Sequence, residues 1–179
     1  MTADEYFALG DQLPPNAQLI DGELVVNSPT FRHDRIILWL SHLHLRFAET
    51  HPGAGEVGTS TDTRIGDHSV YKPGIWWVPE DRQPPGSSNR FAEPPPLVAE
   101  VRSRSTWRFD VGTKLRHYER AGGAEVWLID TYADAVLVFR RSQPSQADFD
   151  VSLELGAGEQ LTTPLIPGWT IDLAELFSR

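Results

Sequence analysis

The stretch that decides the fold is Val98-Ala-Glu-Val-Arg-Ser-Arg-Ser105, followed nine residues later by Lys114. It is typical of a buried strand that ends in a Ser/Arg-rich turn and leads into a helix whose first turns carry the lysine. Glu100 is the one carboxylate inside the apolar run 97–101. Because burying a charge is costly unless the group has a partner or a task, the stretch predicts a strand–turn–helix unit with an important carboxylate.

Two interpretations of Glu100 and Lys114 are open. A carboxylate that holds magnesium and an ammonium that steadies the attacking water, or the charge developing on phosphorus, are what a metal-dependent phosphodiesterase needs. A buried Glu–Lys ion pair that only stabilises the fold uses the same two residue types, and such pairs are common. The spacing of the two residues does not separate these interpretations.

Composition sets the outer limits. A chain of 179 residues with 40% hydrophobic content is long enough for one domain, 1–179, with a substantial core. No apolar run approaches the roughly 20 residues that span a bilayer, and the N-terminus lacks the basic and apolar regions of a signal peptide. The absence of cysteine excludes disulfides and thiolate zinc sites. These features predict a cytoplasmic protein.

The charge distribution is uneven. A net charge of −9 argues against a strong non-specific nucleic-acid binder, whose affinity comes largely from neutralising phosphates. Six of the 16 Lys and Arg residues nevertheless fall between positions 102 and 120, namely Arg102, Arg104, Arg108, Lys114, Arg116 and Arg120. This segment is either a solvated helix face or a phosphate-binding surface beside Glu100.

Local patterns predict the elements of the first half of the chain. Thr2 and Glu5 form a capping box that opens a short helix, and Asp21-Gly22 favours a tight hairpin between strands 17–20 and 23–26. The helical spacing of apolar residues predicts the longest helix over about 31–50, with Trp39 and Leu45 widening its buried apolar stripe. Strands are expected near 55–64 and 69–78, followed by a long polar, proline-rich surface loop over 79–96.

The second half continues as a mixed α+β pattern. A helix over 106–120 should follow the strand that carries Glu100, and strands are expected over 125–130, 135–139 and 149–155. A short amphipathic helix over 172–177 closes the chain. The whole pattern predicts an α+β (α/β-like) fold with a mixed β-sheet flanked by helices.

Seven motifs in order resemble one known family. They are Gln18-Leu-Ile-Asp-Gly-Glu-Leu-Val25, Pro29-Thr-Phe-Arg-His33, Lys72-Pro-Gly-Ile-Trp-Trp-Val78, Glu100-Val-Arg-Ser-Arg-Ser-Thr106, Asp110-Val-Gly-Thr-Lys114, Tyr118-Glu-Arg-Ala-Gly122 and Glu125-Val-Trp-Leu-Ile-Asp130. Together they are similar to the small bacterial Uma-two proteins, restriction-endonuclease-like members of the PD-(D/E)XK nuclease superfamily. The likeness covers nearly the whole chain with compatible spacings.

The resemblance implies a restriction-endonuclease-like fold with a two-carboxylate metal site on adjacent strands. It places Gln18, Gly74, Glu100 and Lys114 at the four polar positions of the family site. Glu100 and Lys114 match that pattern, with the lysine moved from the strand to the next helix. Arg102 stands where the wider superfamily has its lysine.

The departures from the family pattern affect the metal. Gly74 stands where the family has a metal-binding Asp, and Gln18 stands where it has a Glu. Two unit charges about 4 Å apart interact by roughly 4 kcal/mol at an effective dielectric near 20, so a lost anionic ligand weakens binding of Mg²⁺ or Mn²⁺ substantially. Three other carboxylates are candidates to replace the lost ligand, namely Glu23, Asp62 and Asp67.

The resemblance also suggests DNA as the partner and a homo-oligomer, most simply a dimer. Candidate phosphate contacts are Arg102, Ser103, Arg104 and His33, although His33 also suits a capping or packing role and turn serines commonly cap helices. Two classes of function follow. One is a metal-dependent DNA endonuclease, impaired by the changes at 18 and 74. The other is a non-catalytic relative that uses the nuclease fold for DNA binding or protein assembly.

Overall fold

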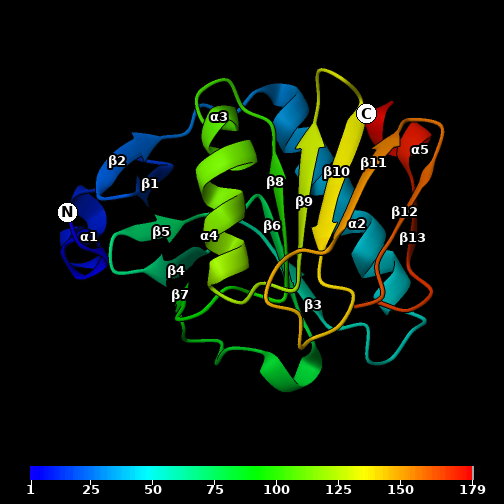
Figure 1. Ribbon diagram of the computed structural model, residues 1–179, viewed down its shortest axis with the longest axis horizontal. Coiled ribbons are helices and arrows are strands. Elements are labelled where there is room, and N and C mark those ends of the chain that lie inside the picture. The colour runs from blue at the N-terminus through cyan, green and yellow to red at the C-terminus, as the bar shows by residue number, and fades with distance from the viewer. Residues whose placement is uncertain (179) are drawn as a thin grey trace.

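The protein is built around a six-stranded mixed sheet, as seen in a computed structural model that describes residues 1–178 (Figure 1). The strand order is β11-β10-β9-β8-β6-β3, and only β8 and β9 are parallel neighbours. The strands are β3 (Glu56–Gly58), β6 (Ile75–Val78), β8 (Leu97–Val101), β9 (Glu125–Asp130), β10 (Ala135–Arg140) and β11 (Val151–Gly156). Arg179, the last residue of the predicted single domain, lies outside the described residues.

The resemblance predicts that the strand bearing Gly74 lies beside the strand of Glu100; the two strands are neighbours, although Gly74 itself forms a bend immediately before β6. β6 pairs with β8 in antiparallel fashion, with Ile75 opposite Ala99 and Trp77 opposite Leu97. The predicted α+β fold with a helix-flanked mixed sheet is confirmed as well. β6 and β8 consist wholly of buried residues, which explains their nearly continuous apolar runs.

Helices cover both faces of this sheet (Figure 1). α2 (Phe31–Ala48) and α5 (Leu173–Phe177) lie on one face, where they build the main core. On the other face, α3 (Trp107–Phe109), the π-helical turn η3 (Asp110–Lys114) and α4 (Leu115–Arg120) form one continuous helical segment. The predicted helix 106–120 is therefore present, but its middle turn is wider than an α-helix.

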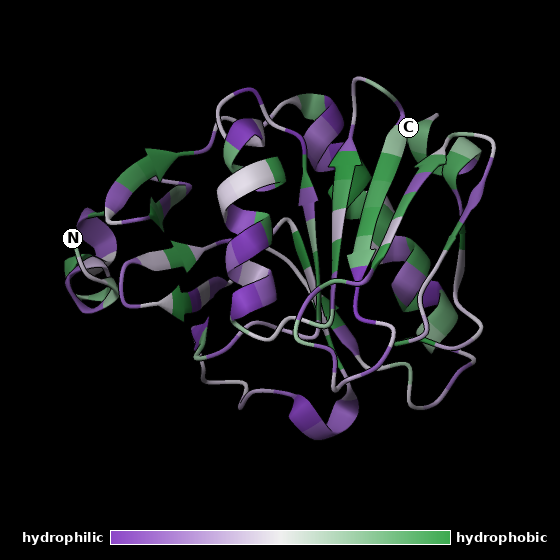
Figure 2. Cartoon of the chain, in the orientation of Figure 1, coloured by the Kyte–Doolittle hydropathy of each residue, from purple (hydrophilic) through white to green (hydrophobic). Residues whose placement is uncertain are grey.

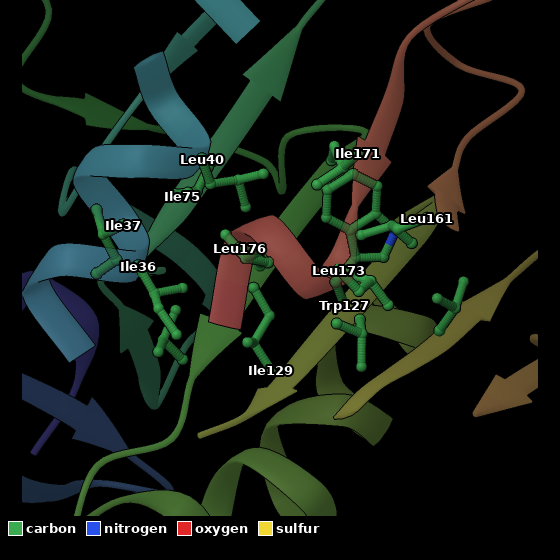
Figure 3. Close-up of a cluster of buried hydrophobic side chains, with 14 of the residues drawn as sticks. Ile36, Ile37, Leu40, Ile75, Trp127, Ile129, Leu161, Ile171, Leu173 and Leu176 are labelled. Atoms are coloured by element: carbon green, nitrogen blue, oxygen red, sulfur yellow. The ribbon is translucent and has the colours of Figure 1, made fainter. Parts of the chain in front are cut away.

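Strand alternation sorts the side chains of β8 between the two faces. Leu97, Ala99 and Val101 join the core under α2 and α5, and Val98 joins the second cluster under α4. Figure 3 shows the larger cluster, in which side chains of α2 and α5 meet Trp127 and Ile129 of β9. Because successive strand residues point to opposite faces, Glu100 points with Val98 toward α4.

A smaller five-stranded sheet carries the N-terminal part of the chain. Its order is β2-β1-β5-β4-β7, with strands β1 (Ala17–Ile20), β2 (Glu23–Val26), β4 (Asp62–Gly66), β5 (Ser69–Tyr71) and β7 (Arg90–Phe91). The hairpin prediction is confirmed, because Asp21 and Gly22 adopt the positive φ angles of a tight turn between β1 and β2. α1 (Ala3–Leu9) packs nearby behind its predicted capping box, and η1 (Gly10–Gln12) follows it.

Three expectations about local structure were wrong. The strands expected over 55–64 and 69–78 are each broken in two, the first near Ser60, which has a φ of 54°, and the second at Pro73-Gly74. The loop 79–96 contains η2 (Glu80–Arg82) and the short strand β7, whose Phe91 is buried edge-on against Trp76. Leu45, expected to widen the buried stripe of α2, is exposed.

The C-terminal segment closes the main core. β12 (Gln160–Thr162) and β13 (Thr170–Asp172) form a two-stranded sheet, and Asp172 caps α5. In Figure 2 the strands β9 and β10 are mostly hydrophobic, whereas the helix that contains α4, to their left, is largely hydrophilic. Among the described residues, no helix is both long and apolar enough to cross a membrane.

Candidate functional site

Glu100 lies at the centre of a buried polar cluster between β8 and α4. Its Oε1 accepts a hydrogen bond from the Tyr118 hydroxyl at 2.8 Å and lies 3.2 Å from Lys114 Nζ. Glu100 is 5% exposed, while Lys114 and Tyr118 are almost completely buried. β8 positions the carboxylate and the helical segment positions both donors. The cluster therefore links the central sheet to the helical segment that covers it.

Asp110 is a second carboxylate in the same cluster. Its Oδ1 lies 2.9 Å from Lys114 Nζ, and its Oδ2 accepts a hydrogen bond from Thr106 Oγ1 at 3.0 Å. The π-helical turn runs from Asp110 to Lys114, and both of its end residues are buried. Lys114 Nζ therefore lies between two carboxylates, with the ring of Tyr71 5.3 Å away on a further side.

The cluster contains two carboxylates and one ammonium, and this imbalance affects the pKa values of Glu100 and Lys114. Burial raises the pKa of Glu100 to about 7 despite the attraction of Lys114, and Asp110 acts in the same direction as burial. Burial alone would lower the pKa of Lys114, but the attraction of Glu100 and Asp110 outweighs it and the pKa is raised. Since two carboxylates share one ammonium, a proton on Glu100 relieves the excess negative charge.

Gln18 is buried near this cluster but bonds elsewhere. Its Oε1 accepts a hydrogen bond from the Lys72 backbone N–H at 3.2 Å, and it makes no hydrogen bond to Glu100 or Lys114 among the described residues. Tyr71, the neighbour of Lys72, forms the link, since its ring packs edge-on against Tyr118. Gln18 thus supports the strand next to the cluster and is not in contact with its charges.

Gly74 offers little room for the aspartate of the family pattern. A Cβ built at this position would lie 3.1 Å from Ile37 Cδ1 and 3.2 Å from the Ala99 carbonyl oxygen. Ile37 belongs to the core under α2, on the opposite face of the sheet from Lys114. A side chain added at 74 would therefore start toward α2 and would require Ile37 to shift.

The four expected phosphate contacts lie in different environments. Arg102 forms an ion pair with Asp130 at 2.8 Å and stacks over the ring of Tyr132. Ser103 is buried and bonds Thr106, so it orders the turn before α3. Only Arg104 is exposed without an ionic partner among the described residues.

His33 belongs to the first turn of α2 rather than to the cluster around Glu100. Its backbone N–H is capped by Thr30, and its buried ring bonds Asp34 through Nδ1 at 2.8 Å. Two of the candidate replacement carboxylates are also engaged elsewhere, because Asp62 pairs with Lys72 and Asp67 pairs with Arg64. Glu23 lies exposed on the edge strand β2.

Sequence reasoning missed Asp110, Tyr118 and Tyr71. A signal for the first two was present, because Asp110, Lys114 and Tyr118 follow one another at intervals of four residues, which places them on one side of a helix. Tyr71 gave no such signal. It comes from β5, in the other sheet, and reaches the cluster only through the tertiary fold.

Comparisons with known proteins identify the family and the fold of the chain. The Uma2 family, described as "Putative restriction endonuclease", matches residues 3–174. A crystal structure of a "putative nuclease belonging to DUF820" from Anabaena variabilis ATCC 29413 has a TM-score of 0.81 and 21% sequence identity, covering 99% of this chain and 98% of that one. No curated protein matches significantly. The chain shares that fold, and it belongs to the Uma2 family of restriction-endonuclease-like proteins.

Proposed function

We propose that this chain acts on DNA as a member of the nuclease family whose phosphodiester hydrolysis is slow or absent. The observation that carries the proposal is the place of Lys114 Nζ, which lies between Glu100 and Asp110 at 3.2 and 2.9 Å. An ammonium there neutralises the same carboxylates that a catalytic cation would need. The family resemblance implies DNA as the substrate and Mg²⁺ or Mn²⁺ as the cofactor.

The donor set does not fit a divalent metal in this arrangement. Mg²⁺ requires near-octahedral oxygen ligands and is held by one or two carboxylates with room for water. Here Glu100 Oε1 already accepts from Lys114 and Tyr118, Gly74 supplies no ligand, and Gln18 bonds the backbone. In the part of the chain that the structure describes, no three His, Cys, Asp or Glu side chains are placed to hold a metal ion together.

Access to the cluster is also restricted. Five cavities of about 310–460 Å³ are described on the molecule, and Glu100, Lys114 and Gln18 line none of these five. A carboxyl group with a pKa near 7 suits proton transfer at neutral pH, but a general acid or base must come within hydrogen-bond reach of its substrate. The cluster as arranged holds β8 against α4 and does not present a group to DNA.

We expect the wild-type protein to bind magnesium weakly and to nick plasmid DNA slowly or not at all. Gly74→Asp alone should restore little, because the added side chain meets Ile37 Cδ1. Combining Gly74→Asp and Gln18→Glu with Ile37→Val, which removes that Cδ1, should still change magnesium binding little, because the side chain at 74 starts toward α2 and Gln18 does not contact the cluster. Calorimetric titration with Mg²⁺ and Mn²⁺ and a plasmid-nicking assay measure the two effects.

Two variants serve as controls for this experiment. Ile37→Val alone makes the same space without adding a ligand, and it should leave magnesium binding unchanged. Glu100→Gln keeps the shape of the carboxylate and removes its charge. Robust metal-dependent nicking by the wild type that disappears in Glu100→Gln would contradict the impaired function and establish an active nuclease.

A second candidate function, protein assembly, is favoured by the outer face of α2. Phe31, Leu38 and Leu45 recur every seven residues and are 92%, 69% and 58% exposed. Seven-residue spacing is the repeat by which two helices pack along a common seam. The occupant that fits is a second copy of the chain.

We therefore expect a homodimer that Leu38→Asp converts to a monomer, because the substitution places a charge at the centre of the apolar stripe. Sedimentation velocity at micromolar concentrations measures the change. Leu153→Asp, at an exposed leucine of β11, is the matched control and should leave the dimer intact. A monomeric wild type across that range would show that α2 does not form this contact.

A further inference from the structure

Four exposed arginines lie on the turn before α3 and on the helical segment that covers the cluster. They are Arg104, Arg108, Arg116 and Arg120. Their spacing is four residues except in the middle, where Gly112 stands in the position of a missing member. Positions 114 and 116 lie roughly 200° apart on a helix, so this outer stripe faces away from Lys114.

The charges of this arginine stripe are not neutralised within the described chain. Six of the eleven other Lys and Arg residues in the described part of the chain have carboxylate partners, namely Arg32, Arg64, Lys72, Arg82, Arg102 and Lys114. None of the four arginines of the stripe forms an ion pair among the described residues, and Arg108 contacts only the ring of Phe109. In a protein of net charge −9, this concentration of unpaired positive charge on one helical segment stands out.

We propose that the arginine stripe binds double-stranded DNA through its phosphates; this rests on the proposed function, which names DNA as the partner. Twelve residues separate Arg108 from Arg120 within the helical segment, which corresponds to about 18 Å at the helical rise. That is about half of one turn of B-DNA, along which a phosphate charge occurs about every 1.7 Å. Guanidinium groups bind phosphate oxygens bidentately, which suits them to this contact.

The stripe is uneven in its surroundings. At one end, Asp21 and Asp67 line a cavity of about 310 Å³ together with Arg120 and His117, and Asp21 lies 3.5 Å from His117 Nε2. Carboxylates repel phosphate, so Arg120 contributes less than Arg108 and Arg116. The DNA path therefore runs past Arg104, Arg108 and Arg116.

The inner and outer sides of the segment have separate tasks in this arrangement. Asp110, Lys114 and Tyr118 point inward to Glu100, whereas the arginines point outward to solvent. DNA held on the outer face is bound without reaching the carboxylate of Glu100. The surface thus accounts for DNA binding by a chain that cleaves slowly.

Fluorescence anisotropy with a labelled 20-base-pair duplex at 50, 100 and 200 mM salt tests this surface. Arg108→Glu combined with Arg116→Glu should weaken binding at least tenfold and reduce the slope of log affinity against log salt by about 2. The control is Arg46→Glu combined with Arg90→Glu. Arg46 is an exposed, unpaired helical arginine like Arg116, and Arg90 packs on a phenylalanine ring as Arg108 does. The control double variant should change the affinity for the duplex less than twofold.

The outcomes separate this surface from the proposed function. No binding of duplex by the wild type at 50 mM salt would overturn both. If the stripe variant and the control variant weaken binding equally, the arginine stripe is not the DNA-binding surface, while DNA remains the partner. If the glutamate substitutions disturb the fold, the milder double variant Arg108→Gln with Arg116→Gln replaces them in the same binding assay. Its thermal unfolding should be unchanged from wild type. A change of sedimentation coefficient in the stripe variants would instead make this face a contact between copies, contrary to the proposal.

Discussion

Replacing Lys114 with methionine is expected to lower the free energy of unfolding by about 3–5 kcal/mol, because it removes the only cation between two buried carboxylates. Glu100 and Asp110 would then face each other without a neutralising charge, in a site that excludes water. Methionine has similar length and fills the space, so the loss reports the charge and not a cavity. Urea-induced unfolding followed by circular dichroism measures the difference.

The matched control is Arg116→Met, two residues away on the exposed side of the same segment, which should change stability by less than about 0.5 kcal/mol. The double variant Glu100→Gln with Lys114→Met removes one negative charge together with the cation. It should recover part of the loss, because the remaining carboxylate no longer has a charged neighbour. If Lys114→Met costs no more than Arg116→Met, the ammonium is not holding the cluster together.

The sequence predicted the parts of this cluster that depend on local pattern. A lone carboxylate in the run 97–101 indicated that Glu100 would be buried and engaged, and the helical pattern after it placed Lys114 on the element facing it. The alternation of β8 then decides which helix Glu100 meets. These features follow from strand and helix periods, which a single sequence displays.

Other parts depend on contacts that no local pattern displays. Tyr71 reaches Lys114 from the smaller sheet, and the orientation of Gly74 toward Ile37 follows from a bend at Pro73-Gly74 that the apolar run 75–78 concealed. Asp110 carried a helical-spacing signal, but a carboxylate in an amphipathic helix is usually solvated. Its burial arises because the π-helical turn and Thr106 fit it under the segment.

The charge imbalance of the cluster predicts a pH dependence of stability. Glu100 has an ordinary pKa of 4.5, and burial raises its pKa in the folded protein to about 7. The folded state therefore binds the Glu100 proton more tightly than the unfolded state. Below pH 4.5 Glu100 is protonated in both states, so its titration does not change the stability. As the pH rises from 4.5 to 7, only the unfolded state loses this proton, so the free energy of unfolding falls. Above pH 7 both states are ionised and the free energy of unfolding no longer changes through Glu100.

Glu100→Gln isolates this effect, since glutamine does not titrate and keeps the shape of the side chain. The stability of the variant relative to wild type should rise with pH by up to about 3 kcal/mol between pH 4.5 and 7 and then level off. Other groups, including Glu125, whose pKa is raised by burial, and His117, whose pKa is lowered by burial, are present in both proteins and cancel in the difference. The raised pKa of Lys114 matters only at alkaline pH.

Urea unfolding of both proteins at half-unit steps from pH 4.5 to 8 measures the difference curve. A curve that rises through this window places a proton on Glu100 at mildly acidic pH, which leaves the single ammonium of Lys114 paired with Asp110. A flat curve would mean that Glu100 stays ionised throughout, with Lys114 and the Tyr118 hydroxyl together compensating its burial. In that case Glu100 would carry a full negative charge at neutral pH, and a cation that displaced Lys114 would find the ligand that metal binding requires.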